Sequence, residues 1–292
     1  YAAVGWHPEN CAPYTSESLD TLRQWAKSPK VVAIGEIGLD YYWEQNPPRE
    51  WQQEVFRAQL ALAQELSLPV IVHDRDAHAD SLAIVKEFPD VRGVFHCYSG
   101  SAEIAQELLK LGWYLGFDGP LTYKNAKKTV EVARIVPLER VLLETDSPYM
   151  SPVPVRGTRN DSRNVFHIAA KFAELRGMEV DEVIALTSEN GKRLFGMSDR
   201  IFFLPSVGTP ISASRKSPAQ NCAGLFASIC RPTAGLHYKC SQSIKGQNKG
   251  KNPFQGNKKT LKPLKLQGFF WCAVQDSNSE NKIFSNKLHQ IM

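Results

Sequence analysis

Short apolar runs alternate with longer amphipathic stretches along the first two thirds of the 292-residue chain. In the clearest run, at 31–40 (VVAIGEIGLD), a row of mostly β-branched aliphatic residues is typical of a strand that is buried on both faces. Between such runs, apolar residues spaced three and four apart predict helices. The pattern indicates six strands, at Ala2–His7, Val31–Glu36, Val70–His73, Gly93–His96, Tyr114–Asp118 and Val141–Asp146.

The predicted strands recur at a spacing that suits a parallel sheet with helical crossovers. Their ends, taken at positions 7, 36, 73, 96, 119 and 146, lie 29, 37, 23, 23 and 27 residues apart. Short apolar strands that end in polar groups favour an α/β fold, a (β/α)8 barrel of the TIM type, in which the carboxyl ends of the strands meet at one mouth. An open doubly wound sheet is the alternative, although the sequence contains neither a G-x-G-x-x-G motif nor a P-loop.

Four of the predicted strand ends carry a residue that can bind a metal. An ionised carboxylate such as Glu36, inside an apolar run, needs a cationic partner, and a metal ion can serve as one. His73, His96 and Asp146 end three further strands. A single histidine after an apolar strand is more often structural than a ligand, but four ligand-type residues at four strand ends are not expected by chance. Two imidazoles and two carboxylates suit Zn²⁺, Mn²⁺ or a similar divalent ion.

Seven short motifs follow one another along residues 1–197: GWHP (5–8), GEIGLDYY (35–42), VHDRD (72–76), HCYSG (96–100), ETDSPY (144–149), RGTRN (156–160) and ENGKRLFG (189–196). In their order and spacing they resemble the motifs of the TatD family of metal-dependent hydrolases. The resemblance implies a metallo-hydrolase barrel that acts on phosphodiester bonds, usually those of DNA. It also implies that Glu36 bridges two divalent ions, that His73 and His96 complete the shell of one ion, and that Asp146 binds the other. The resemblance does not distinguish Zn²⁺, Mn²⁺ and Mg²⁺.

The resemblance is incomplete at the N-terminus. Members of the family usually open with a His-x-His pair on a first strand and add a second strand before the GWHP segment, whereas this sequence starts at the strand that leads into GWHP. We therefore expect an N-terminally incomplete barrel with about six of its eight strands. We also expect the loss of two imidazoles to weaken one ion site and to reduce activity.

In the two-ion arrangement, catalysis would depend on Asp146 and Glu36. Paired ions acidify water and stabilise charge on the attacking and leaving oxygens, and Asp146 could orient or deprotonate that water. Cationic side chains near the mouth are candidates for holding phosphate oxygens, with a solvated surface or a helix-end contact as the alternative. His7 either faces the substrate or has a structural role. The candidate substrate-binding residues are His7, Arg75, Lys124, Arg156 and Arg159.

The loop after the Glu36 strand carries three aromatic residues in succession, Tyr41, Tyr42 and Trp43. Rings of this kind can stack on nucleic-acid bases. Loop aromatics that merely cover the mouth of a barrel are as common, so both interpretations stay open.

Charge divides the chain into two segments. Of its 35 Lys and Arg and 30 Asp and Glu, 14 and 3 fall in residues 198–292, a balance of +11, which leaves 21 and 27, or −6, for residues 1–197. The basic segment has almost no hydrophobic periodicity. We therefore expect a low-complexity tail that is disordered or foreign to the product, rather than a nucleic-acid-binding arm. The predicted domains are the barrel over 1–197 and this tail over 198–292.

The preferred function is that of a deoxyribonuclease, with DNA as substrate and divalent ions as cofactors. Two alternatives remain: a non-catalytic fragment with a nucleic-acid-binding tail, and a metal-dependent esterase or deacylase that acts, for example, on aminoacyl-tRNA. Six cysteines without disulfide or metal-finger spacing favour a reducing cytoplasm. No run approaches the length of a membrane span, and the sequence indicates no obligate protein partner.

Overall fold

Strands and helices alternate along the part of the chain that the computed structural model describes, residues 1–197. The predicted tail, 198–292, lies outside the described residues. The strands are β1 (Ala2–Val4), β2 (Val31–Asp40), β3 (Val70–Arg75), β4 (Gly93–Phe95), β5 (Tyr114–Phe117) and β6 (Val141–Leu143). The α-helices are α1 (Ser16–Trp25), α2 (Arg49–Leu66), α3 (His78–Lys86), α4 (Ala102–Lys110), α5 (Lys127–Ile135), α6 (Val165–Arg176) and α7 (Val180–Leu194). The 3-10 helices are η1 (Pro8–Asn10), η2 (Gly119–Thr122), η3 (Leu138–Arg140) and η4 (Ser162–Asn164).

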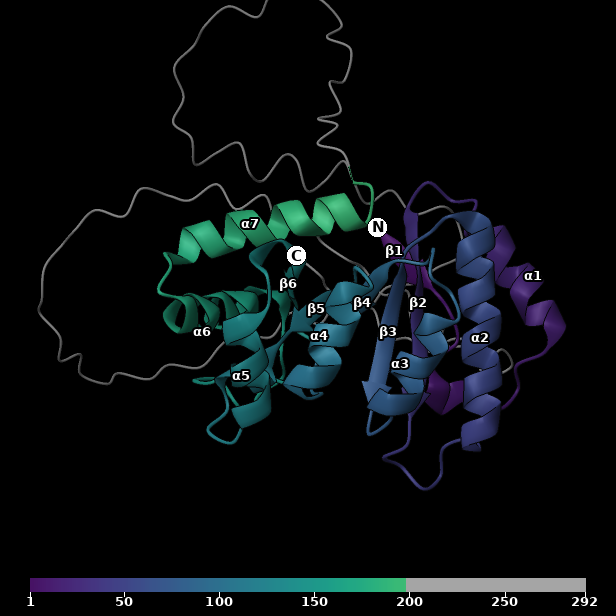
Figure 1. The fold of residues 1–292 in the computed structure, drawn as a ribbon, viewed down its shortest axis with the longest axis horizontal. Helices are drawn as coiled ribbons and strands as arrows, with labels where there is room; N and C mark the ends of the chain where they lie inside the picture. The colour runs from purple at the N-terminus through teal and green to yellow at the C-terminus, as the bar shows by residue number, and fades with distance from the viewer. Residues whose placement is uncertain (198–292) are drawn as a thin grey trace, which may run out of the picture. The chain divides into compact units, whose positions relative to one another are not determined.

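The six strands form one parallel sheet in which they lie side by side in chain order, from β1 to β6. Figure 1 shows the helices following the same order, from α1 and α2 beside β2 to α6 and α7 near β6. A doubly wound sheet would reverse its strand order at a switch point, and this sheet does not. The prediction of a (β/α)-barrel fold is confirmed, and the doubly wound alternative is excluded.

The two faces of the sheet pack against different partners. Side chains alternate along a strand, so Val70 and Val72 join the large cluster formed with the helices, while Ile71 points to the opposite, inner face. Phe195, just after α7, packs into the inner cluster and closes it. The buried inner-face residues are Ala33, Ile71, Val94, Tyr114, Leu142 and Phe195.

The pairing of β2 with β3 shifts register between Ile34 and Ile37. Both isoleucines pack on the helix side although they lie three positions apart, which strict alternation does not allow. The irregularity places Glu36 and the residues two and four positions after it on the inner face. The strand was predicted to end at Glu36, which is wrong: β2 continues in pairing with β3 to Asp40.

β3 also continues beyond its predicted end at His73, to Arg75. The other four strands end earlier than the sequence predicted. β1 stops at Val4, before His7, and β6 stops at Leu143, before Asp146. β4 and β5 each end one residue before the predicted end. The chain turns out of the sheet at these points, into η1 after His7 and through a left-handed backbone conformation at Asp146. The apolar pattern does not register these turns, because the residues stay buried after pairing ends.

Helix α7 is fastened to the sheet by a buried asparagine of the ENGKRLFG motif. The Asn190 side-chain amide donates to the carbonyl oxygens of Leu138 and Val141, at 2.8 and 2.9 Å. These bonds satisfy backbone groups where β6 begins, and they seat α7 so that Phe195 reaches the inner cluster. Among residues 1–197, no helix combines the length and the apolar character that crossing a bilayer requires.

Replacing Gly38 by alanine should destabilise the fold strongly. Gly38 has a φ of +136°, and a Cβ built on it would lie 2.0 Å from the His73 carbonyl oxygen. Backbone strain and overpacking together should lower the free energy of unfolding by about 2–5 kcal/mol. Urea denaturation measures the loss. Gly177→Ala is the matched control, because Gly177 also has a positive φ (+64°) but meets no atom within 4 Å. Equal losses in the two variants would contradict the close packing of β2 on β3.

The contribution of His78 to stability should depend on pH. The Asp74 carboxylate, 2.7 Å from His78 Nδ1, raises the pKa of His78 above its usual value. A raised folded-state pKa gives stability that is fully present below the unfolded-state pKa and is lost as pH rises through the folded-state pKa. The difference in unfolding free energy between the unaltered chain and His78→Gln should therefore be larger at about pH 6 than at about pH 9. A difference that does not change with pH would contradict this pair.

Candidate metal centre

The carboxyl ends of the strands bring polar side chains together on the inner face of the sheet. In each of three strands, the residue two positions beyond an apolar inner-face residue is polar, and alternation carries it onto the same face. These residues are His73, His96 and Glu144, and the shifted register of β2 adds Glu36. Glu36, His96 and Glu144 are buried, Glu144 completely, whereas 14% of the His73 side chain is exposed.

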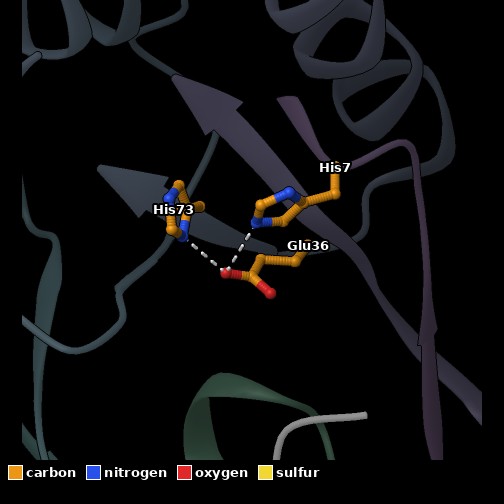
Figure 2. A group of neighbouring side chains, drawn as sticks. All are labelled: His7, Glu36 and His73. Atoms are coloured by element: carbon orange, nitrogen blue, oxygen red, sulfur yellow. Dashed lines mark hydrogen bonds and ion pairs between the residues drawn. The ribbon is translucent and has the colours of Figure 1, made fainter. Parts of the chain in front are cut away.

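One oxygen of Glu36 is the meeting point of three imidazole rings. Glu36 Oε1 lies 2.9 Å from His73 Nδ1 and 3.5 Å from His7 Nε2, and it contacts His96 Nε2. Figure 2 shows His7 and His73 pointing at the carboxylate from two sides. A carboxylate oxygen has two lone pairs, so three ring nitrogens exceed what hydrogen bonding to it can satisfy. The arrangement suits a cation better than it suits a hydrogen-bond network.

Outer carboxylates orient two of these rings. His73 Nε2 donates to Asp40 Oδ2 at 3.0 Å, and His96 Nδ1 lies 3.4 Å from Glu144 Oε2. When the rings are neutral and carry their protons on these outer nitrogens, their lone pairs turn inward, on His73 Nδ1 and His96 Nε2, which lie only 3.3 Å apart. Imidazole ligands of metals are commonly held by carboxylates in this manner. The donor set therefore fits a divalent ion held by Glu36, His73 and His96.

His7 is placed differently from the other two histidines. Its Nδ1 accepts a hydrogen bond from the Glu9 backbone N–H at 3.3 Å, so the neutral ring carries its proton on Nε2, the atom that faces Glu36. The possible ligand atoms of His7, Glu36 and His73 all lie within 4.8 Å of one another. In this tautomer, however, the His7 nitrogen that faces Glu36 carries a proton, so it donates a hydrogen bond and has no lone pair for a metal ion. The side chain is completely buried. Of the two roles considered for His7, direct contact with substrate would require access that this position does not give.

The pKa values of the inner rings are raised. Burial alone would lower the pKa of His73, but its hydrogen bonds to Asp40 and Glu36 outweigh burial and raise it. Burial acts in the same direction on His96, and the carboxylates of Glu36 and Glu144 raise its pKa well above the usual value. The carboxylates thus make this position strongly attractive to positive charge, whether a proton or a metal ion carries it.

Asp40 and Glu144 are functional residues that the sequence interpretation missed. The second oxygen of Asp40 accepts hydrogen bonds from the Tyr42 backbone N–H and the Asn46 amide, both at 3.0 Å. The other oxygen of Glu144 accepts from the Cys97 backbone N–H at 2.8 Å. Both carboxylates therefore have fixed orientations. Alternation was a usable signal for Glu144, which precedes Asp146 by two positions on a predicted strand.

A second group of acidic residues lies on the far side of His96. Burial, together with the carboxylates of Glu144 and Asp146, raises the pKa of Asp118 well above its usual value. The Cys97 thiol donates to Asp118 Oδ2 at 3.1 Å, and burial with the nearby carboxylates raises its pKa as well. Cys97 is therefore held as a thiol. Asp146 lies with these acids, buried after the end of β6.

Asn160, in the RGTRN motif, holds the backbone around Asp146 in place through hydrogen bonds. The Asn160 side-chain amide donates to the carbonyl oxygens of Thr145, at 2.5 Å, and Tyr149, at 2.6 Å. The Asn160 backbone N–H also donates to the Pro148 carbonyl at 3.0 Å. Asn160 is itself buried. The motif thus fixes the backbone on both sides of Asp146.

The predicted phosphate-binding cations lie on segments that follow the carboxyl ends of the strands. Arg75 ends β3 and stacks on the Tyr42 ring, 4.6 Å from its centre. Arg156 stacks on Tyr123 in the same manner, at 4.1 Å. Lys124, Arg156 and Arg159 are exposed. Their positions are on the same end of the sheet as the metal centre, since they follow β5 and β6.

Comparisons of the sequence and of the structure with known proteins agree on one family. A family model described as TatD related DNase matches residues 1–196. The chain is 48% identical to an uncharacterized metal-dependent hydrolase, YabD, of Bacillus subtilis over 67% of this chain and 77% of that protein. It is 38% identical to a 3'-5' ssDNA/RNA exonuclease TatD of Erwinia amylovora, over 68% and 78%. The crystal structure of YjjV, a TatD homolog of Escherichia coli K12, matches with a TM-score of 0.64 and 36% identity, over 68% of this chain and 77% of that one.

Replacing Glu36 by glutamine should weaken metal binding more than any change outside the centre. The substitution removes the charge at the point where the rings converge, so affinity for Zn²⁺ or Mn²⁺ should fall by about 100-fold or more. Asp40→Asn, which alters only the partner of His73, should cost about 10- to 100-fold. Calorimetric titration of the demetallated full chain measures both affinities. His167→Gln, on α6, is the control and should bind as the unaltered chain does. Unchanged binding in Glu36→Gln would contradict the proposed ligand set.

Proposed function

This chain belongs to the TatD-related DNase family of metal-dependent hydrolases, and on that premise we propose that it is a nuclease that hydrolyses single-stranded DNA from the 3' end. The relative from Bacillus subtilis is named a metal-dependent hydrolase. The choice of a phosphodiester as substrate is supported by the relatives that are named 3'-5' ssDNA/RNA exonucleases.

One observation carries the proposal: two imidazole lone pairs and a carboxylate oxygen converge in a buried position on the catalytic end of a (β/α)-barrel sheet. In this fold the carboxyl ends of the strands carry the chemistry. A divalent ion held there would supply Lewis acidity, which acidifies water and stabilises charge on phosphoryl oxygens.

The chain's own residues account for proton transfer and for water exclusion. Asp146, buried near Asp118 and Cys97, is the candidate to accept the proton of the attacking water. The Nε2–H of His7 faces the oxygen of Glu36 and keeps that carboxylate oriented. The buried apolar residues of the inner cluster precede the centre along the strands and exclude water from that end of the inner face.

Arginine and lysine side chains around the centre would hold the phosphates. A guanidinium can bind two phosphate oxygens at once, which orients the scissile bond as well as neutralising it. Arg75, Arg156 and Arg159 are the candidates, with Lys124 as a point charge. Stacking on tyrosine rings restrains two of these arginines before substrate arrives.

The full chain should release mononucleotides from the 3' end of a labelled single-stranded oligonucleotide when Mn²⁺ or Zn²⁺ is supplied. EDTA should abolish the reaction. Asp146→Asn should lower kcat by about 10²- to 10⁴-fold, because it removes the proton acceptor. Product length, read by gel electrophoresis, distinguishes release from the 3' end from internal cleavage.

An aminoacyl-tRNA and a carboxylic ester, assayed in parallel, test the deacylase and esterase alternatives. Hydrolysis of either in preference to the oligonucleotide would overturn the proposal, as would a chain that binds metal but hydrolyses none of the three. His167→Gln serves as the control for loss of a histidine outside the centre. The predicted cytoplasmic location stays a prediction.

A further inference from the structure

Two aromatic side chains stand out of the surface at the end of β2. Tyr42 and Trp43 are 48% and 49% exposed, although large aromatic residues usually bury most of their surface. The two rings are nearly perpendicular, at 87°, with centres 4.7 Å apart. They are therefore in contact with each other while much of their surface still faces solvent.

The backbone beneath the rings is fixed. The Asn46 backbone N–H donates to the Trp43 carbonyl at 3.1 Å, closing a turn. The Asn46 side-chain amide donates to the carbonyl oxygen of Asp40, at 3.1 Å, and to its carboxylate. Exposed rings on a restrained turn lose little conformational freedom when a ligand binds, which favours affinity.

The turn is joined directly to the metal centre. Asp40 accepts from the Tyr42 backbone N–H on one oxygen and from His73 on the other, so one carboxylate separates the rings from a proposed ligand. Arg75 lies two residues after His73 on β3, and its guanidinium covers one side of the Tyr42 ring. Aromatic surface and positive charge thus occur together beside the hydrolytic position.

Building on the nuclease function proposed above, we propose that Tyr42 and Trp43 form a stacking subsite for one unpaired base of a single-stranded nucleic acid. Every base has a planar face, so such a subsite binds without sequence preference. A base within a duplex already stacks on its neighbours and cannot use the subsite. Arg75 supplies charge for the phosphate next to the stacked base. The rings therefore select single strands over duplexes.

The test is binding of a fluorescein-labelled oligothymidylate to the full, metal-free chain, followed by anisotropy. An abasic oligonucleotide of equal length, with the same phosphates and no bases, is measured beside it. Trp43→Ala and Tyr42→Ala should each weaken binding of the oligothymidylate roughly 5- to 100-fold. Binding of the abasic strand should change little. Tyr42→Phe, which keeps the ring, should retain the affinity.

The alanine variants keep the Tyr42 backbone N–H, so the titration of Mn²⁺ should match that of the unaltered chain. Ile135→Ala is the matched control: Ile135 is 48% exposed but ends α5, before β6 begins, at the opposite end of the sheet. In cleavage assays the alanine variants should raise KM and leave kcat nearly unchanged. Unaltered affinity for the oligothymidylate, or equal loss for the abasic strand, would overturn the subsite. If the unaltered chain cleaves no nucleic acid, the nuclease function fails, and the binding comparison still decides the subsite.

Discussion

Two imidazole nitrogens that face each other across 3.3 Å, His73 Nδ1 and His96 Nε2, are the constraint on which the rest of this structure depends. Unless a proton or a metal ion lies between them, the two nitrogen lone pairs repel, and burial removes the water that would weaken this repulsion. The chain holds them there through Asp40 and Glu144 behind the rings and Glu36 between them. Each of these carboxylates also needs space beside the neighbouring backbone. A Cβ at position 116, for example, would lie 2.0 Å from a carboxylate oxygen of Glu144. Close approach of strands is thus part of the metal centre.

Parallel strands in chain order make such a centre possible, because residues far apart in sequence end at one edge. Alternation then selects which of them face inward. β3 and β4 obey it without exception, and the apolar residues of the inner cluster lead directly to His73 and His96. β2 obeys it only after a register shift between Ile34 and Ile37. Without that shift, Glu36 would point toward the helices, where a carboxylate would have no cationic partner. An irregularity in one strand therefore completes a centre that regular strands begin.

The sequence was sufficient for the fold class and for three of the converging residues, because both follow from patterns that a sequence displays. Apolar runs at βαβ spacing indicate a parallel sheet, and polar residues at the ends of such runs mark its active edge. The extension of β2 to Asp40 could not be predicted, since pairing beyond Glu36 depends on Gly38 fitting against the His73 backbone. The donor tautomer of His7 depends on the backbone N–H of Glu9, which forms η1. Local contacts of this kind do not appear in the hydrophobic periodicity of the sequence, so they cannot be predicted from it. Alternation also predicts that Glu144 faces inward, but only Asp146, the last residue of the predicted strand, has the strand-end position that marks a ligand.

The negative charge of residues 1–197 means that a nucleic-acid substrate needs local positive charge at the site. Residues 1–197 carry a net −6, and Asp118, Glu144 and Asp146 lie buried on one side of His96. A nucleic acid is a polyanion, so a surface of this sign repels it at long range. For the proposed substrate to bind, positive charge must be concentrated where the phosphates pass. A divalent ion between Glu36, His73 and His96 would reverse the sign at the centre, and Arg75 and Arg156, restrained on tyrosine rings, would extend that reversal to the rim. The buried carboxylates that would bind the ion are also the reason why a scissile phosphate can be held at the centre only when the ion is present, whereas a base stacked on the rim does not depend on it.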